Sequence, residues 1–148
     1  MLRINRQTDY AVRVLLALAK RGEGTRLSSA TIQQEMLIPV AFLPRIVAQL
    51  ARADLLKTFP GRDGGLMLPR PAYQINLRHV VEAFEGPILL SACLDVKNED
   101  DCPFQANCPV SPKWGRVQVA MMREMAAITF EQLAKESLGV PMGTPNIV

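Results

Sequence analysis

The chain has 148 residues, of which 49% are hydrophobic and 21% are charged. This length suits one well-cored domain, or a small domain with an added oligomerisation element, and the composition excludes an intrinsically disordered chain. The first apolar run, residues 10–19, is too short to span a bilayer and has no small-residue cleavage site. We therefore expect a cytoplasmic protein with neither a signal peptide nor a membrane anchor.

Charge is distributed unevenly along the chain. Residues 1–70 contain eleven Lys and Arg against five Asp and Glu, whereas residues 71–148 contain six against nine. A basic half favours a polyanionic partner such as nucleic acid, and the acidic half does not. On charge alone, a solvated basic surface is the simpler interpretation, so sequence motifs are needed to choose between this and a nucleic-acid-binding surface.

The first predicted helix covers residues 6–21. Apolar side chains recur in it at three- and four-residue spacing, and glycines end the pattern. Thr8 or Asp9 lies near its start, where a short polar side chain can cap free amides. Asp9 therefore has a simple role as a helix cap.

Two further helices are predicted close together. One begins after Ser28 or Ser29 as N-cap and ends near residue 36, and the next covers residues 40–53. Two short helices separated by about three residues are typical of a helix-turn-helix. Pro44 is tolerable there only if it lies in the first turn of the second of these helices.

A β-hairpin is predicted next. Residues 55–59 and 66–68 are apolar and are joined by a Gly- and Pro-rich turn at residues 60–65. A hairpin directly after a helix-turn-helix is a wing, and Arg62 at its tip is placed to enter a minor groove. We assign residues 1–75 to a winged helix-turn-helix domain. Its predicted DNA-binding residues are Arg3, Ser28, Ser29, Val40, Ala41, Arg45, Arg62 and Gly64.

The second half is predicted to be helical. Asn76 caps a helix over residues 77–85, a long helix covers residues 113–127, and a last helix covers residues 129–138. The long helix has a wide apolar face, which we interpret as a dimer interface, although it would also suit a buried core. The fold class is mainly α with a small β-hairpin wing and a long dimerisation helix, and residues 139–148 form a flexible tail. The apolar face consists of Trp114, Val117, Met121, Met125 and Ile128, with Ala120, Met122 and Ala126 beside it.

All three cysteines of the chain lie within residues 93–108. Cys93, Cys102 and Cys108 occupy a polar segment that contains prolines and has neither a helical nor a strand period, so we expect a loop. An odd number of clustered cysteines in a reducing compartment indicates metal or redox chemistry, not a disulfide framework.

These motifs, taken together and in this order, resemble one family of bacterial regulators. The chain is similar to the winged-helix iron–sulfur transcriptional regulators typified by IscR, NsrR and RirA, over nearly all of its length. The residues that carry the resemblance are Leu2–Ile4, Thr8–Arg13, the wing turn Gly61–Gly65, Val80–Gly86, the three cysteines with Pro103, and Ile128–Leu133.

The resemblance implies a homodimer that binds a palindromic operator on double-stranded DNA, with an iron–sulfur cluster that sets its operator affinity. It implies that Cys93, Cys102 and Cys108 ligate the cluster, and that Asp9 of the other subunit supplies a further ligand. Members with a two-iron cluster use a histidine after the third cysteine, which this chain lacks, and His79 is expected at the surface. We therefore expect a 4Fe-4S cluster, with residues 76–138 forming the cluster-binding loop and dimerisation helices.

The resemblance points to a repressor that senses nitric oxide, iron or redox state, and it does not choose among these signals. Three alternatives remain open. A zinc site made of the three cysteines and Asp9 would be structural and colourless, and a metal-free thiol switch would oxidise reversibly. A non-DNA iron–sulfur carrier is disfavoured by the basic winged helix. An enzyme is not expected, because the sequence contains neither a nucleophile–base constellation nor a phosphate loop.

Overall fold

The computed structural model describes residues 3–98 and 102–137, and the predicted tail at residues 139–148 lies outside this part. In it, α1 (Arg6–Lys20), α2 (Ser29–Met36) and α3 (Leu43–Arg52) precede a two-stranded antiparallel hairpin of β1 (Lys57–Phe59) and β2 (Gly65–Met67). Then follow α4 (Leu77–Glu85), α5 (Ser111–Ala127) and α6 (Phe130–Ser137). The predicted fold class, mainly helical with a β-hairpin wing, is confirmed.

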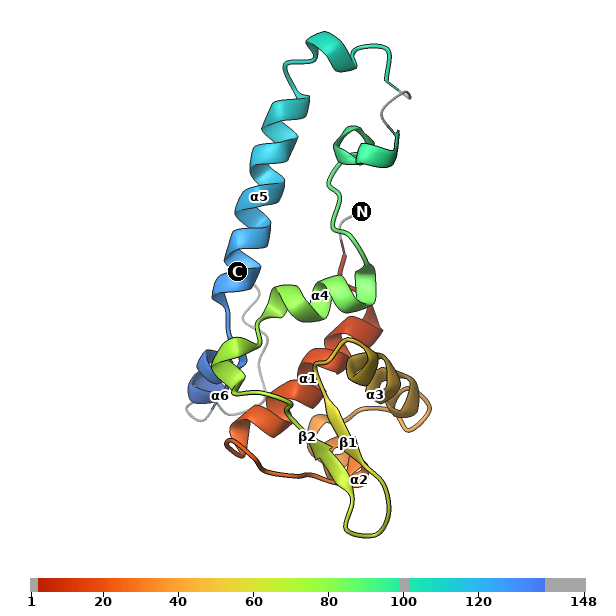
Figure 1. Ribbon diagram of the computed structural model, residues 1–148, viewed down its shortest axis with the longest axis vertical. Coiled ribbons are helices and arrows are strands. Elements are labelled where there is room, and N and C mark those ends of the chain that lie inside the picture. The colour runs from red at the N-terminus through yellow and green to blue at the C-terminus, as the bar shows by residue number, and fades with distance from the viewer. Residues whose placement is uncertain (1–2, 99–101, 138–148) are drawn as a thin grey trace.

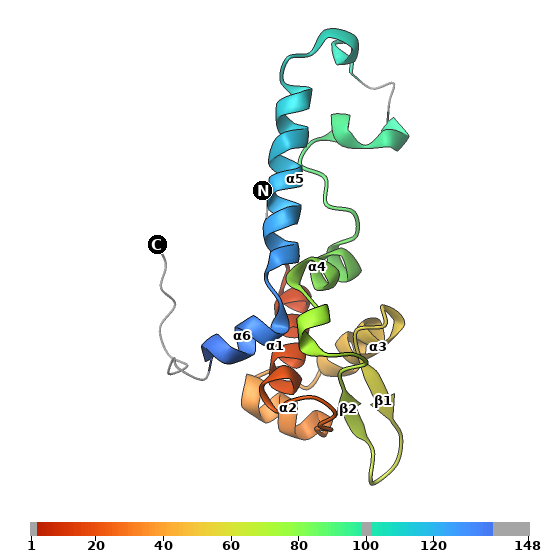
Figure 2. The same cartoon turned by 60° about the vertical axis from the view of Figure 1, so that its left-hand side comes forward.

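The molecule consists of a winged-helix body and a projecting arm (Figures 1 and 2). The body contains α1 to α4, the hairpin and α6, whereas α5 and the segment that precedes it extend away from it. Short 3-10 turns at Ala92–Leu94, Val96–Asn98 and Gln105–Asn107 form the far part of the arm. None of the described helices is long and apolar enough to cross a bilayer.

One hydrophobic core holds the body together. Its members come from α1, α2, α3 and the hairpin, but Val80 of α4 and Phe130 of α6 belong to the same cluster. The core therefore continues across the predicted boundary at residue 75. α1 packs against α6 and α4, so the chain returns to the winged helix after it has built the arm.

The cap of α1 differs from the sequence-based expectation, and the cap of α4 involves one residue more than expected. The N-cap of α1 is Asn5, whose side-chain oxygen accepts from the Thr8 amide at 2.9 Å, so the prediction of Thr8 or Asp9 as cap is wrong. Asn76 caps α4 as predicted, but His79 completes a capping box by accepting from the Asn76 amide at 3.2 Å. His79 is thus half-buried rather than a plain surface residue.

The direction of the pKa shift of His79 suits its role in the capping box. Burial, followed by the nearby charge of Arg70, lowers the pKa of this side chain. A neutral imidazole keeps Nδ1 available as the acceptor that the capping box requires.

Candidate functional site

The helix-turn-helix consists of α2 and α3, and its second helix starts later than predicted. α3 begins at Leu43, not near Val40, because Phe42 donates its amide to the Pro39 carbonyl at 3.0 Å and closes a turn there. Pro44 lies in the first turn of α3, as predicted. Val40 is 68% exposed in the turn that leads into α3. An exposed apolar side chain at this place can contact thymine methyl groups in a major groove.

Two other predicted DNA-binding residues flank that turn. Ala41 is exposed in it, and Arg45 is exposed on α3. The turn itself depends on Leu37, which adopts a left-handed conformation with φ 52° and ends α2. Leucine usually avoids that region. Here the Ile38 amide donates to the Gln33 carbonyl at 3.1 Å and the Ile38 side chain is 2% exposed, so both the hydrogen bond and the packing stabilise this helix end.

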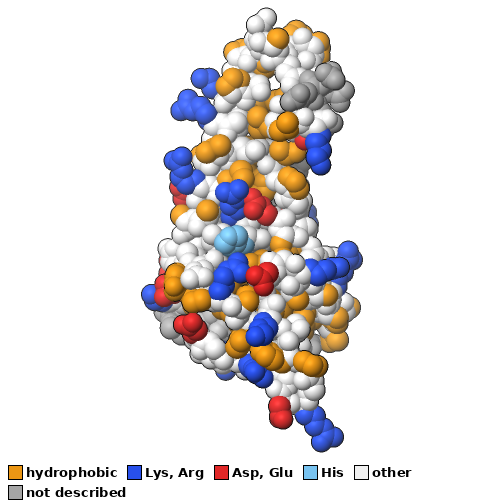
Figure 3. All heavy atoms as spheres, viewed as in Figure 1, with side chains coloured by type: hydrophobic (Ala, Val, Ile, Leu, Met, Phe, Trp, Pro, Cys, Tyr) orange, Lys and Arg blue, Asp and Glu red, His pale blue; other side chains and the backbone are white. Residues whose placement is uncertain are grey.

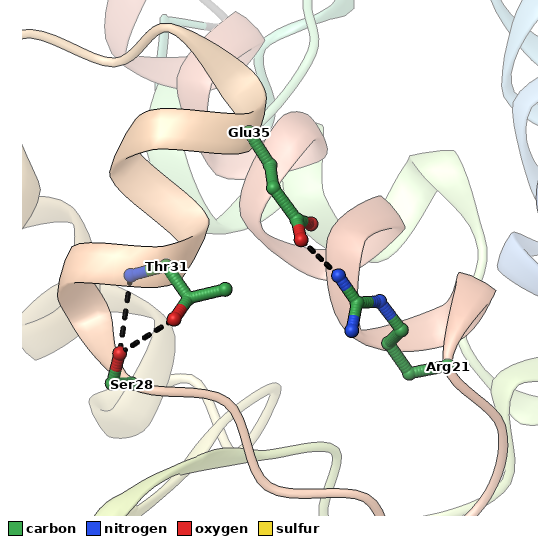
Figure 4. A network of polar contacts seen from close by, with 4 residues as sticks. All are labelled: Arg21, Ser28, Thr31 and Glu35. Atoms are coloured by element: carbon green, nitrogen blue, oxygen red, sulfur yellow. Dashed lines mark hydrogen bonds and ion pairs between the residues drawn. The ribbon is translucent and has the colours of Figure 1, made fainter.

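The N-terminus of α2 is a capped helix start (Figure 4). The Ser28 hydroxyl accepts from the Thr31 amide at 3.1 Å and bonds to the Thr31 hydroxyl at 2.8 Å. Arg21, after α1, forms an ion pair with Glu35 of α2 and fixes the two helices to each other. Ser29 is exposed at the first position of α2, where it and the free amides suit a phosphate group.

At one position of the wing turn, only a glycine fits. A Cβ atom on Gly64 would lie 2.2 Å from the carbonyl oxygen of Phe59 and 2.8 Å from that of Gly61. Gly64 is therefore required by the turn itself, and it presents Arg62 at the exposed tip. Arg3, the remaining predicted DNA-binding residue, is exposed beside α4 and α5, far along the molecule from the wing.

Asp9 lies in the first turn of α1 and is connected to the helix-turn-helix. Its carboxylate pairs with Arg13 at 2.8 Å, and the same guanidinium donates to the carbonyl of Met36, the last residue of α2, at 3.2 Å. Beside this pair, the Tyr10 ring packs on Phe42 with 5.4 Å between ring centroids. The acid–base spacing of four residues is a sequence signal that could have found the ion pair, although no such pair was predicted.

A second polar link joins the start of α1 to the end of α4. Glu85 accepts from the Asn5 amide at 2.9 Å and from the hydroxyl of Thr8, which is fully buried. Desolvation raises the pKa of Glu85, but the hydrogen bonds from Thr8 and Asn5 outweigh it and lower the pKa overall. Glu85 is 80 positions from Asn5 and 77 from Thr8 in the sequence, so no local pattern could have found the link.

The three cysteines lie on the arm, are free thiols and are partly exposed. Cys102 and Cys108 flank the Gln105–Asn107 turn and line one shallow hollow of about 350 Å³. Cys93 lies beside the start of α5, where hydrogen bonds from Ser91, at 3.2 Å, and then from Ser111 lower its pKa. A lowered pKa favours the thiolate, which is the form that binds metals and reacts with oxidants.

The structure does not bring all predicted ligands together in one chain. Among residues 3–98 and 102–137, no three His, Cys, Asp or Glu side chains are close enough to hold a metal ion. Asp9 lies in the body, whereas the cysteines lie on the arm (Figure 1). In the described part of a single chain, Asp9 therefore lies apart from the three cysteines.

Comparison with known proteins identifies the family. The family model named Rrf2, described as an iron-dependent transcriptional regulator, matches residues 4–136. The chain belongs to the Rrf2 family. It is 34% identical over 135 residues to protein aau3 of Rhizobium meliloti, covering 90% of this chain and 86% of that relative. It is also 27% identical to the HTH-type transcriptional regulator NsrR of Oceanobacillus iheyensis, over 99% of this chain and all of that one.

Solved structures of Rrf2-type regulators share the fold. CymR of B. subtilis, described as its global cysteine regulator, superposes with a TM-score of 0.73 at 26% identity, covering 92% of this chain and 98% of that one. IscR of T. potens superposes with a TM-score of 0.72 at 19% identity, covering 96% and 94%. The predicted family and the winged-helix fold are confirmed, and the chain is a DNA-binding transcriptional regulator.

Proposed function

We propose that this Rrf2 regulator is a homodimeric, cytoplasmic repressor whose affinity for a palindromic operator is set by a 4Fe-4S cluster. Cys93, Cys102 and Cys108 of one subunit hold the cluster, and Asp9 of the other subunit supplies an oxygen ligand. The observation that carries the proposal is the position of three free, partly exposed thiols on an arm that projects from a winged-helix body. The signal is nitric oxide, iron or redox state.

The donor set suits such a cluster. Thiolates are the ligands that iron–sulfur clusters use, and they are available here without a competing disulfide among the described cysteines. His79, the only histidine of the chain, is used in the capping box of α4. Three sulfur ligands with one weaker oxygen ligand fit a four-iron cluster better than a histidine-ligated two-iron cluster. When bound, such a cluster supplies a redox-active and nitric-oxide-reactive group.

The arm supports dimerisation. α5 has 17 residues and none of them is buried in the single chain, so about 25 Å of helix lacks a complete packing partner. Trp114 is 44% exposed and Val117 is 51% exposed on the apolar face predicted to form the interface. A second copy of the arm would cover that face, and its two-fold symmetry would place two winged helices on two half-sites.

Contacts within the chain connect Asp9 to the segment that leads into the DNA-binding helix α3. Arg13 joins the Asp9 carboxylate to the Met36 carbonyl at the end of α2, and Tyr10 contacts Phe42 directly before α3. A change in the position of Asp9 would therefore alter the turn that presents α3. A coupling of about 1–3 kcal/mol of this kind changes affinity by roughly 5- to 150-fold.

A metal-free thiol switch is the second candidate, and one observation favours it. Hydrogen bonds from Ser91 and Ser111 lower the pKa of Cys93. In this case operator affinity would be set by reversible oxidation of a cysteine thiolate and not by a cluster. A structural zinc site is a third candidate with the same ligands.

One experiment separates these candidates. The protein is purified without oxygen, and its visible spectrum and its iron, zinc and sulfide contents are measured. The proposal expects brown protein with about four iron and four sulfide per subunit, and operator affinity that changes when the cluster is removed. Zinc without iron would select the structural site, and metal-free protein with oxidant-dependent DNA binding would select the thiol switch. Metal-independent, oxidant-independent binding would reject all three.

Asp9→Ala is expected to shorten the lifetime of the cluster, because it removes the oxygen ligand that the partner subunit supplies. The lifetime is read as the loss of visible absorbance after addition of an iron chelator. Asp9 is half-exposed in its ion pair, so folding stability should change by less than about 1 kcal/mol.

Arg13→Ala is the matched variant, since it removes the ion pair and the bond to Met36 but leaves the carboxylate in place. It should retain the cluster while it reduces the difference in operator affinity between the loaded and the empty protein. If Asp9→Ala has the wild-type lifetime, Asp9 is not a ligand.

Arg62→Ala is expected to weaken operator binding and to lower the slope of log affinity against log salt by about 0.9 for each phosphate that Arg62 neutralises in the wild type. Arg62 is exposed at the wing tip, where Gly64 fixes the turn. Lys135→Ala on α6 is the control that removes a positive charge away from the wing. An unchanged salt slope would mean that the wing tip does not contact the phosphate backbone.

A further inference from the structure

An aromatic ring with two cations over it lies on the hairpin, directly before the wing turn. Phe59, the last residue of β1, has the guanidinium carbon of Arg26 3.6 Å from its ring centroid and the Lys57 nitrogen 5.2 Å from it. Arg26 and Lys57 are both exposed, whereas Phe59 is half-buried. None of these three residues was assigned a role from the sequence.

The stack depends on chain pairing that no local pattern reveals. Leu27 forms an antiparallel bridge with Leu66 of β2, which places Arg26 next to Gly65. Gly65 in turn pairs with Phe59 across the hairpin. Because Gly65 has no side chain, Arg26 can extend across it to the Phe59 ring. A Cβ atom at position 65 would lie 2.9 Å from the Leu27 carbonyl oxygen and 3.6 Å from the Arg26 Cβ atom.

The charges of this stack are not balanced by acids in the described part of the chain. In the described part of the chain, neither Arg26 nor Lys57 has a carboxylate within 4 Å, whereas Arg13, Arg21, Arg70, Arg78 and Lys135 each do. A guanidinium that stacks on a ring keeps its N–H groups directed outward in its own plane. This geometry leaves the planar fork free for bidentate binding to a phosphate.

The stack lies next to the surfaces that already suit DNA. Arg26 is two residues before Ser28, the cap of α2, and Lys57 begins the strand that leads to the wing tip. Figure 3 shows Lys and Arg side chains at the hairpin end of the molecule, including its far tip. Arg26 and Lys57 therefore lie between the start of α2 and the wing tip, and neither forms an ion pair within the described part of the chain.

We propose that Arg26 and Lys57 bind the phosphate backbone of duplex DNA beside the wing, and that Phe59 is a positioning residue that holds the Arg26 guanidinium. The occupant is the DNA backbone because the site is cationic, exposed and continuous with the helix-turn-helix and the wing. It has no base-reading role, so it adds affinity without sequence preference. This inference rests on the proposed operator binding.

The test uses the full chain, purified without oxygen, and a duplex that carries the site this protein enriches from a pool of random sequences. Affinity is measured over a range of salt concentrations. Arg26→Ala should weaken binding roughly tenfold and lower the salt slope by about 0.9 for each phosphate that Arg26 neutralises. Arg26→Lys should keep most of the slope but not all of the affinity, since lysine lacks the planar fork.

Phe59 variants test the positioning role separately from charge. Phe59→Leu should weaken binding about two- to fivefold, and Phe59→Tyr, which keeps the ring, should restore the affinity. The effect of Phe59→Leu should be smaller when Arg26 is already alanine, because the two residues act together. Circular dichroism spectra confirm that each variant is folded.

The outcomes distinguish this inference from the proposed function. If no sequence is enriched from the pool, operator binding itself fails. If a sequence is enriched but Arg26→Ala has the same salt slope as the wild type and the Lys135→Ala control, the phosphate contact is rejected. Full additivity of Phe59→Leu and Arg26→Ala would reject the positioning role alone.

Discussion

Replacing Cys102 by alanine is expected to abolish the visible absorbance and the bound iron and sulfide of protein purified without oxygen. Cys102 and Cys108 line the same hollow on either side of one short turn. In the proposed cluster, removal of one of three thiolates would leave only two sulfur ligands beside the weaker oxygen ligand. The effect is therefore expected to be a complete loss and not a partial one.

The control for this substitution is Phe104→Ala. Phe104 lines the same hollow and is 72% exposed, so its truncation disturbs the surface without removing sulfur. The Phe104 variant should keep its full iron and sulfide content. If Cys102→Ala retains iron at the wild-type level, Cys102 is not a ligand and the cluster assignment fails. If wild-type protein contains zinc that Cys102→Ala loses, the cysteines form a structural zinc site.

The loss of the cluster also determines how the Cys102→Ala variant is expected to bind DNA. The variant should bind the operator as the cluster-free wild type does, whichever form binds more tightly, because the remaining chain is unchanged. A variant that differs from the cluster-free protein would show that Cys102 acts on DNA binding by another route, such as oxidation to a disulfide with Cys108.

The elements of the winged helix could be predicted because they are encoded locally. The apolar spacing of α1, the Ser28 cap of α2 and the glycine-rich wing turn all lie within a few residues of the features they determine. The start of α3 was placed about three residues too early, since the turn at Pro39 depends on a backbone hydrogen bond to Phe42 that sequence spacing does not reveal. Asn5 was not identified as the N-cap of α1, because Asn5, Thr8 and Asp9 all have side chains that can cap a helix and the sequence does not choose among them.

Contacts between distant segments could not be predicted from one sequence. The Glu85 bonds to Asn5 and Thr8, the Gln49 bond to the Ala83 carbonyl at 2.9 Å, and the stack of Arg26 on Phe59 all require the folded body. Long-range pairs of this kind depend on which elements pack together, which residue type and spacing do not encode. The same limit applies to the cysteine segment. Its composition predicts a loop with metal or redox chemistry, but it does not reveal how far this loop extends from Asp9.

Phe130→Ala is expected to destabilise the protein by about 3–5 kcal/mol, the largest stability effect predicted for this chain. Phe130 is fully buried and is among the largest of the fully buried side chains. It lies at the first position of α6, where its amide donates to the Ile75 carbonyl at 2.9 Å. Truncation to alanine would leave a cavity where α6 packs against α1, in a core that also contains α2, α3 and the hairpin.

The measurement is urea unfolding followed by circular dichroism at one fixed protein concentration, because the proposed dimerisation would make apparent stability depend on concentration. Phe130→Leu is the matched variant, since it keeps an apolar side chain and should cost less than half as much as Phe130→Ala. The Ala variant should also lose operator affinity in parallel with its folded fraction, since α6 and α4 hold α1 in place. A loss below about 1 kcal/mol would mean that α6 does not belong to the cooperative core, and that the winged helix folds independently of the segment that follows the arm.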